Sequence, residues 1–181
     1  MDKESKEGTE FKEPFELAEK VDLQKYATGT WYVISHIPLS SEPSLNESET
    51  YTLGSDGKIK IEYRYTDPIN HTEKVLHQTM WPLNNKNNMM RHQINEAETI
   101  DYGILDIDTE GYQWMAVVTL DKKNCWIMAR KTTLETKIQE RLIGKLGLLG
   151  FQIVNLQQCC HKKFDEIHHQ ATAHQQHQQV V

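Results

Sequence analysis

The residues of this chain whose types suit chemistry are mainly cysteines and histidines, and their spacing limits what they can do. Cys125, Cys159 and Cys160 are too few for a disulfide framework. The adjacent Cys159-Cys160 pair lacks the second Cys-x-x-Cys arm of a zinc site, so we expect free or partly buried thiols and no bound metal or cofactor. No Ser-His-Asp order and no pair of inward carboxylates stands out, so the sequence predicts no catalytic site.

The carboxyl-terminal region, HKKFDEIHHQATAHQQHQQVV, is rich in histidine and glutamine and has almost nothing apolar to bury. These histidines can bind a transition metal adventitiously, but no neighbours enforce a regular i, i+4 pair, which favours a solvated tail. They are His161, His168, His169, His174 and His177. We therefore expect a charged, flexible amino terminus over 1–13, one domain over 14–158 and a disordered tail over 159–181.

Between these ends the dominant sequence period is two, which is typical of strands. In residues 58–65 charged side chains occupy one face, and the other face carries Ile59, Ile61, Tyr63 and Tyr65. The tetrapeptide Gly54-Ser55-Asp56-Gly57 precedes this strand, and its Asp-Gly step is a strong signal for a tight turn. Residues 48–53 are therefore predicted to form a hairpin with 58–65.

Further strands follow at regular intervals, separated by turns rich in Asp, Asn, Gly and Pro. With the hairpin they number eight, over 31–37, 48–53, 58–65, 74–81, 88–94, 101–107, 112–120 and 124–130. Such short strands suggest a barrel or a sandwich, and closure into a barrel removes the exposed edges of an open sheet. The predicted fold class is all-β, an eight-stranded antiparallel up-and-down β-barrel.

A helical period begins only after the last strand. Thr132-Thr133-Leu134-Glu135 offers a capping box with Thr132 as N-cap, and Gly150 is placed to end the helix. We expect the helix to pack on the outside of the barrel through one apolar stripe, formed by Leu134, Ile138, Leu142, Leu146 and Leu149. Residues 151–156 are predicted to form a short ninth strand.

Particular residues add to this order of elements. The chain opens with Val21-Asp22-Leu23-Gln24-Lys25-Tyr26 and Gly29-Thr30-Trp31-Tyr32, followed later by Asp101-Tyr102 and by Trp126-Ile127-Met128-Ala129-Arg130. These segments, the helix and Gly150-Phe151-Gln152-Ile153 resemble the ordered motifs of the lipocalin family, over about residues 14–158. Within the family the chain is most similar to bacterial lipocalin, plant temperature-induced lipocalin and apolipoprotein D.

The resemblance implies structural roles for Gly29, Trp31 and Arg130. A tryptophan at the barrel floor supplies a large apolar plug, and an arginine from the last strand can lie over its ring in a cation–π contact of about 0.5–2 kcal/mol. The resemblance also implies an alternative to free thiols, a bridge from Cys125 to Cys159 or Cys160. The first strand departs from the family pattern, since Val33 replaces an inward glutamate and His36 an outward arginine.

An eight-stranded barrel of this family encloses space for one small ligand, and alternation predicts which side chains line it. The predicted inward, ligand-binding residues are Val33, Ser35, Tyr51, Ile61, Tyr63, Tyr65, His77, Thr79, Trp81, Met90, His92, Ile94, Tyr102, Ile104, Met115, Val117, Trp126 and Met128. This lining suits a fatty acid, a lysophospholipid, a retinoid-like molecule or a tetrapyrrole. His77 and His92, on consecutive strands, are candidates to hold a carboxylate, a phosphate or a haem; each also fits a hydrogen-bonded or mouth-exposed histidine.

The resemblance implies binding, transport or scavenging of a small hydrophobic ligand, with fatty acids and lysophospholipids first, in connection with stress. Two alternatives stay open: an enzyme of this fold acting on a lipophilic substrate, and a protein-interaction module that uses the barrel mouth or the tail. Lipocalin enzymes need an inward cysteine, whereas Cys125 lies between inward Asn124 and Trp126 and is predicted to point outward. We therefore expect no enzymatic activity.

Composition restricts partners and compartment. A formal net charge of −6 argues against a nucleic-acid-binding surface. No apolar run reaches the length of about 18 residues that a spanning helix needs, which leaves peripheral membrane association. Because MDKESKEGTE lacks the apolar core of a secretory signal, the expected compartment is cytoplasmic, or periplasmic, outer-membrane or extracellular if a leader was removed. A monomer or a weak homodimer is expected.

Overall fold

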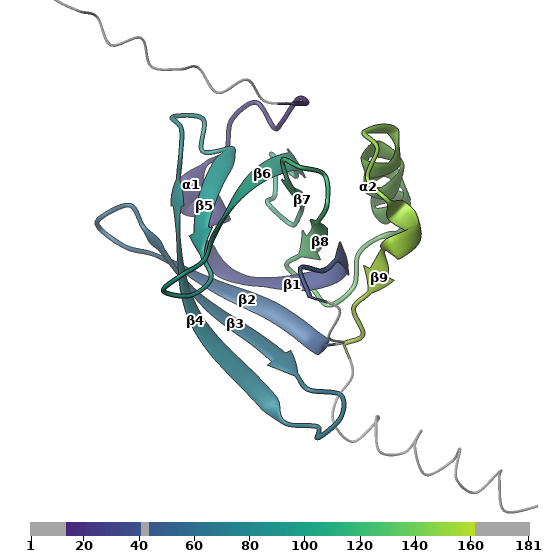
Figure 1. Ribbon diagram of the computed structural model, residues 1–181. Helices are drawn as coiled ribbons and strands as arrows, with labels where there is room; N and C mark the ends of the chain where they lie inside the picture. Colours follow the sequence, from purple (N-terminus) through teal and green to yellow (C-terminus); the bar gives the residue numbers. More distant parts are fainter. Residues whose placement is uncertain (1–13, 41–43, 162–181) are drawn as a thin grey trace, which may run out of the picture.

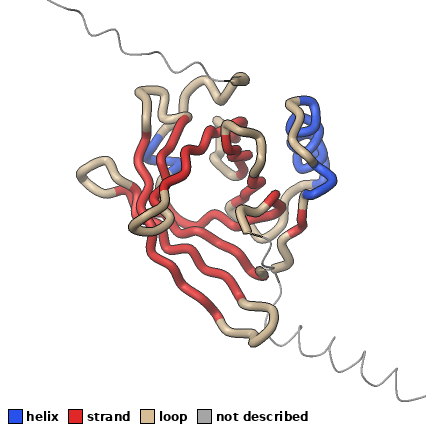
Figure 2. The backbone as a smooth tube through the Cα atoms, viewed as in Figure 1, coloured by secondary structure: helices blue, strands red, loops and turns tan. Residues whose placement is uncertain are grey.

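The computed structural model describes residues 14–40 and 44–161, which fold around one sheet of antiparallel strands. The strands are β1 (Thr28–Ile37), β2 (Leu45–Leu53), β3 (Ile59–Thr66), β4 (Glu73–Pro82), β5 (Met89–Gln93), β6 (Thr99–Ile107), β7 (Trp114–Thr119), β8 (Cys125–Ala129) and β9 (Gln157–Gln158). Each strand from β2 to β7 pairs with the next, and β1 closes the ring by pairing with both β8 and β2 (Figures 1 and 2). The prediction of an eight-stranded up-and-down barrel with one extra strand is confirmed.

A tight turn sets the register of β2 and β3. Gly57 has a φ of +77°, which side chains rarely adopt, and Asp56 Oδ1 accepts a hydrogen bond from the amide of Lys58 at 3.1 Å. In the resulting register Tyr51 lies opposite Ile61, and both are buried inside the barrel. The predicted hairpin is therefore confirmed, with its apolar face inward.

The floor of the barrel is built by the short helix α1 (Leu23–Tyr26) and the tryptophan that follows it. Asp22 caps α1, because its side chain accepts hydrogen bonds from the amides of Gln24 and Lys25. Trp31 is fully buried, and its indole Nε1 donates to the carbonyl oxygen of Tyr26 at 3.0 Å. The indole thus plugs one end of the barrel.

Arg130 covers this plug from outside. Its guanidinium lies against the Trp31 ring and donates to backbone carbonyl oxygens of Lys25 at 2.8 Å and Thr30 at 3.2 Å. Gly29 lies beside it with a φ of +79°, a conformation that favours glycine. One side chain from the end of β8 therefore joins the last barrel strand to the first turn of the domain.

Helix α2 (Thr136–Leu148) stands outside the ring of strands (Figure 1). Leu142 and Leu146 are fully buried in an apolar cluster with outward-facing residues of the barrel wall. Cys125 belongs to the same cluster, so the prediction that it points away from the barrel interior is confirmed. Within the described residues no helix is both long and apolar enough to span a membrane.

The ends of α2 differ in part from the prediction. The predicted capping box at Thr132 is wrong: the helix begins at Thr136, its N-cap is Glu135, and no side chain caps it. Gly150, with a φ of +92°, follows the helix end as predicted. Residues 151–156 do not form a strand, because the amides of Ile153, Asn155 and Leu156 donate to carbonyl oxygens within the segment and give the short helical turn η1 (Ile153–Asn155).

Strand β9 and the residues after it fill a gap between β1 and β2. The pairing of β1 with β2 extends only to Tyr32 and Ser48. Beyond that point β1 pairs with β9, where Ser35 lies opposite Gln158. The first and second strands of the barrel are therefore separate over this stretch.

Three further residues complete this closure. The amide of Cys159 donates to the carbonyl oxygen of Ile34 at 2.9 Å, and the amide of Asn46 donates to that of Cys160 at 3.0 Å. His161 Nε2 lies 2.7 Å from the carbonyl oxygen of Val33. We call residues 157–161 the seam segment. Contacts with the barrel thus continue three residues beyond the expected domain end at 158, while 1–13 and 162–181 lie outside the described residues.

Candidate functional site

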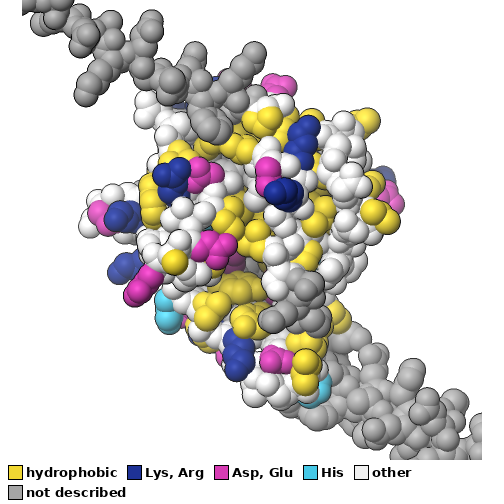
Figure 3. All heavy atoms as spheres, viewed as in Figure 1, with side chains coloured by type: hydrophobic (Ala, Val, Ile, Leu, Met, Phe, Trp, Pro, Cys, Tyr) yellow, Lys and Arg dark blue, Asp and Glu magenta, His cyan; other side chains and the backbone are white. Residues whose placement is uncertain are grey.

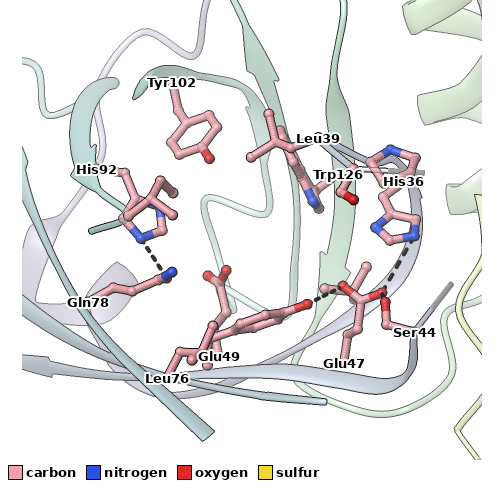
Figure 4. Close-up of a pocket in the computed structure, with 15 residues that line it drawn as sticks. His36, Leu39, Ser44, Glu47, Glu49, Leu76, Gln78, His92, Tyr102 and Trp126 are labelled. Atoms are coloured by element: carbon pink, nitrogen blue, oxygen red, sulfur yellow. Dashed lines mark hydrogen bonds and ion pairs between the residues drawn. The ribbon is translucent and has the colours of Figure 1, made fainter. Parts of the chain in front are cut away.

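The interior of the barrel opens into a cavity of about 220 Å³. Seven strands and the loop after β1 contribute its lining (Figure 4), which consists of Val33, His36, Pro38, Leu39, Ser40, Ser44, Glu47, Glu49, Tyr63, Leu76, Gln78, His92, Ile94, Tyr102 and Trp126. A deeper chamber of about 30 Å³ extends toward the floor, where Tyr26 and Tyr51 line it. The cavity is therefore closed at the Trp31 end and open at the other.

Hydrophobic side chains gather around a hollow in the surface of the molecule (Figure 3). Leu39 and Leu76 line the cavity and are 49% and 45% exposed, respectively. Large apolar side chains that are exposed together at a rim are typical of a binding site.

The structure places most of the predicted inward residues inside the barrel. The open cavity is lined by Val33, Tyr63, His92, Ile94, Tyr102 and Trp126, and the deeper chamber by Tyr51, Val117 and Met128. The packed interior around these spaces contains Ile61, Met90, Ile104 and Met115. Tyr65 stacks on Tyr63 with ring centres 5.3 Å apart and lines a separate groove beside the β3–β4 loop.

Strand β4 has the opposite phase from the predicted one. Directly opposed residues of antiparallel strands share a face, and inward Ile61 lies opposite Gln78. The residues wrongly expected inside therefore point outward, and these are His77, Thr79 and Trp81. The prediction failed because Met80 and Trp81 are adjacent, large and apolar, so alternation alone cannot decide which of them is buried.

This correction also removes the predicted histidine pair. His77 is exposed and lies opposite Glu62 on the outer face, so it does not meet His92. The inner positions of β4 belong to Leu76, Gln78 and Met80.

A β-bulge in β1 places His36 inside the barrel and Ser35 outside, contrary to the prediction. The register with β8 shifts between Val33 and Ser35. Ser35 lies opposite Ile127 of the outer cluster, whereas His36 lies opposite Trp126, which lines the cavity. One extra residue reverses the phase of the strand beyond it, which a period of two does not anticipate.

Glu47 and Glu49 both reach the cavity from β2, which corrects the expectation that there is no pair of inward carboxylates (Figure 4). A signal for them existed in the sequence, because counting back by two from inward Tyr51 gives Glu49 and then Glu47. Their charge argued against burial, since carboxylates are rarely buried without partners.

Three side chains hold Glu47, which is 3% exposed. Tyr63 donates its hydroxyl to Glu47 Oε2 at 3.0 Å, and Ser44 donates its hydroxyl to Oε1. His36 Nε2 lies 3.6 Å from Oε1. Burial lowers the pKa of His36, and the nearby Glu47 carboxylate opposes that shift. Both oxygens of Glu47 are therefore occupied by groups of the protein itself.

Glu49 is less completely paired. The Tyr51 hydroxyl donates to its Oε2 at 2.5 Å, and no other hydrogen bond to this carboxyl group is present among the described residues. Burial raises the pKa of Glu49 to about 7; the Tyr51 hydrogen bond opposes this shift and the charge of Glu47 adds to it. In Figure 4 the carboxyl group projects into the middle of the cavity. Of the two acids, Glu49 is the one that faces a ligand.

His92 lies on the opposite wall of the cavity. Its Nε2 is 2.9 Å from Gln78 Oε1, and its ring centre is 5.5 Å from that of Tyr102. Burial lowers the pKa of His92 to about 4, so the ring is neutral near neutral pH. A neutral ring that donates from Nε2 satisfies the amide oxygen of Gln78.

Among the residues that the structure describes, neither the cavity nor the deeper chamber is lined by a lysine or an arginine. In the described part of the chain no three His, Cys, Asp or Glu side chains are grouped as metal ligands. Cys125 and Cys159 are free, and they lie in the outer and inner clusters on opposite sides of the barrel wall. Burial raises the pKa of Cys125 to about 11 and that of Cys159 to about 12, so neither is a ready nucleophile.

A family model described as the lipocalin-like domain matches residues 21–161. The chain belongs to the lipocalin family. Members of this family bind small hydrophobic ligands and are mainly binding and transport proteins. In this lipocalin the cavity lies above the Trp31 plug.

Several solved structures share the fold of this lipocalin. Insecticyanin from the tobacco hornworm Manduca sexta superposes with a TM-score of 0.64 at 12% identity, covering 81% of this chain and 84% of that chain. The cockroach allergen Per a 4 gives 0.62 at 15% identity, covering 82% and 94%. The amine binding protein of Rhodnius prolixus, in complex with tryptamine, gives 0.59 at 15% identity, covering 86% and 92%. These identities show the fold alone, and a search of curated proteins finds no match.

Proposed function

We propose that this lipocalin binds a small hydrophobic molecule in the barrel cavity and carries or scavenges it. The observation that supports this most is an internal space with apolar and aromatic walls, closed at the Trp31 end and bordered at the other by exposed leucines. Its volume of about 220 Å³ lies below the range of about 300–1,000 Å³ for drug-sized ligands. A compact ligand or a single short chain therefore fits best.

The chemistry of the walls favours a ligand whose body is apolar. Val33, Ile94 and Trp126 line the cavity from three different strands or strand ends, and Leu76 extends this surface to the rim. Burying apolar ligand surface against them yields about 25 cal/mol per Å² before the costs of association. Polar groups are few and lie at fixed points, which suits recognition of one head group.

The ligand class depends on that head group. The resemblance to bacterial lipocalin, temperature-induced lipocalin and apolipoprotein D favours fatty acids and lysophospholipids, whose chains suit the apolar walls. The tryptamine complex of the Rhodnius prolixus protein supports amines as another class for this fold. The charge of the lining distinguishes these classes, as developed below.

Native mass spectrometry of the purified full-length chain, followed by solvent extraction, tests the proposal directly. A bound small molecule of defined mass that disappears on denaturation is the expected result. A folded protein that carries nothing is then titrated with N-phenyl-1-naphthylamine, an uncharged fluorescent probe. Absence of binding in both measurements contradicts a carrier function.

A pair of matched variants shows where the probe binds. Ile94→Trp fills part of the cavity and is expected to weaken probe binding by about tenfold or more. Val75→Trp makes the same change at a position opposite Arg64 on the outer face and is expected to leave binding unchanged. Equal effects of the two substitutions would place the probe outside the cavity and contradict the proposed site.

A further inference from the structure

The charge inside the cavity carries an inference about the ligand that rests on the proposed function. Two carboxyl groups, Glu47 and Glu49, line a space to which the described part of the chain contributes no lysine or arginine. Burying a carboxylate without a compensating cation or hydrogen bonds costs free energy. The free protein therefore holds an acidic group whose charge the described side chains compensate only in part.

Glu47 and Glu49 differ in how well the protein satisfies them. Glu47 accepts hydrogen bonds from Tyr63 and Ser44 and has His36 beside it. Glu49 accepts only from Tyr51 among the described residues, and its carboxyl group lines both the open cavity and the deeper chamber. The second oxygen of Glu49 is therefore the acceptor that a ligand meets first.

We propose that the cavity takes small amphiphiles that join an apolar body to a protonated amine, and that Glu49 pairs with the ammonium group. A buried cation beside a carboxylate gains a charge-assisted hydrogen bond and removes the cost of leaving the carboxylate unpaired. Aromatic rings of Tyr102 and Trp126 line the same space and favour a cation further. The apolar body then lies against Val33 and Ile94.

The same geometry disfavours fatty acids. A ligand carboxylate in this cavity meets two glutamates and, within residues 14–40 and 44–161, no lysine or arginine of the lining. Like charges that share a buried site repel, and one of them must bind a proton. Arg130 does not line the cavity, because its guanidinium lies against the Trp31 ring and donates to carbonyl oxygens of the floor. The fatty-acid expectation therefore gives way to amines.

The groups around Glu49 determine how binding depends on pH. Tyrosines from α1, β2, β3 and β6 have pKa values raised by burial, with a contribution from Glu49, so they stay protonated; they are Tyr26, Tyr51, Tyr63 and Tyr102. Burial lowers the pKa values of His36 on β1 and His92 on β5. Glu47 is the remaining acid in this set. Near neutral pH Glu49, with a pKa of about 7, is the group whose charge changes.

Isothermal titration of the full-length chain with octylamine, 1-octanol and octanoic acid tests the inference, because the three probes share one chain length. At about pH 8 octylamine is expected to bind at least about 30-fold more tightly than 1-octanol, and octanoate more weakly than either. The affinity for octylamine is expected to rise by up to about tenfold between about pH 6 and about pH 8, because Glu49 ionises while the alkylammonium stays charged.

Two variants complete the test. Glu49→Gln is expected to reduce octylamine binding to the level of 1-octanol and to remove the pH dependence. Glu62→Gln, on the outer face of β3, is the matched control and is expected to change neither. Retention of the amine preference in Glu49→Gln, or equal binding of octylamine and octanoate to the native chain, overturns the inference while the proposed carrier function stands. Failure of all three probes to bind a folded chain that binds N-phenyl-1-naphthylamine overturns the inference alone, whereas failure of all four probes in a chain that carries no ligand overturns both.

Discussion

The guanidinium carbon of Arg130 lies 3.6 Å from the centre of the Trp31 ring. Trp31 belongs to the first strand of the barrel, and Arg130 directly follows the last one, β8. The arginine also donates hydrogen bonds to carbonyl oxygens of Lys25, Thr30 and Tyr112. The contact closes the floor beneath the cavity. Hydrogen bonds from a charged donor contribute about 1.5–3 kcal/mol each, and the cation–π contact about 0.5–2 kcal/mol.

Arg130→Met is expected to lower the free energy of unfolding by about 2–4 kcal/mol, because the methionine covers the indole but leaves those carbonyl oxygens without a donor. Trp31→Ala is expected to cost about 3–5 kcal/mol through the cavity it creates. Urea unfolding measures both. Arg64→Met, which removes exposed ion pairs to Glu62 and Glu73, is the control and is expected to change the free energy of unfolding much less than Arg130→Met does. Equal losses of unfolding free energy for Arg64→Met and Arg130→Met would show that the contact at the floor stabilises the fold no more than an exposed ion pair does.

The bulge in β1 predicts different results for two adjacent residues. The hydroxyl of Ser35 is buried and has no hydrogen-bond partner among the described residues, so Ser35→Ala is expected to raise stability by about 1 kcal/mol and to leave octylamine binding unchanged. His36→Ala is expected to alter octylamine binding, because His36 lines the cavity beside Glu47. Thermal unfolding and titration check the pair. The opposite pattern, in which Ser35→Ala changes octylamine binding and His36→Ala does not, would show that β1 has no bulge and that Ser35 faces the cavity.

Two ionisable groups that line the cavity give the stability of the free protein opposing dependences on pH. Folding raises the pKa of Glu49 from 4.5 to about 7, so the native state binds more protons than the unfolded state and stability falls as pH rises through that window. Folding lowers the pKa of His92 from 6.5 to about 4, so its contribution makes stability rise over that interval, and His36 acts in the same direction. The two effects largely cancel where they overlap.

Substitution separates these two effects. Glu49→Gln is expected to leave a stability that rises with pH between about 4 and 6.5, by up to about 3 kcal/mol. His92→Gln is expected to leave a stability that falls between 4.5 and about 7. Denaturant unfolding across this range measures both slopes. A flat profile in both variants would mean that neither group is buried as described.

The seam segment is expected to protect the start of β2. A chain that ends after Leu156 lacks the carbonyl oxygen of Cys160, to which the amide of Asn46 donates, so hydrogen exchange at Asn46 is expected to accelerate by about tenfold or more. A chain that ends after His161 keeps this bond and is the matched control. Amide exchange followed by NMR measures it. The same protection in both chains would assign the closure of this gap to β1 and β2 alone.

Local residue patterns were sufficient to predict the barrel. Alternation in 58–65, the Asp56-Gly57 turn and the evenly spaced strands agree with one another, and closure is the solution that leaves no open edge. The helix stripe through Leu142 and Leu146 and the end at Gly150 were predictable for the same reason. The start of the helix at Thr136 was not, because no side chain caps it.

The lining of the cavity was only partly predictable. Phase within a strand follows from alternation when one face is clearly apolar, as for Ile59 and Ile61, but not where Met80 and Trp81 are adjacent. The amino-acid sequence by itself therefore determined the family, the order of strands and the Trp31–Arg130 floor. The tertiary structure alone decided that His77 points outward, that a bulge turns His36 inward, and that Glu49 faces a cavity whose described lining has no lysine or arginine. Those outcomes depend on pairing between strands, and the free energy of pairing is shared by residues far apart in the chain.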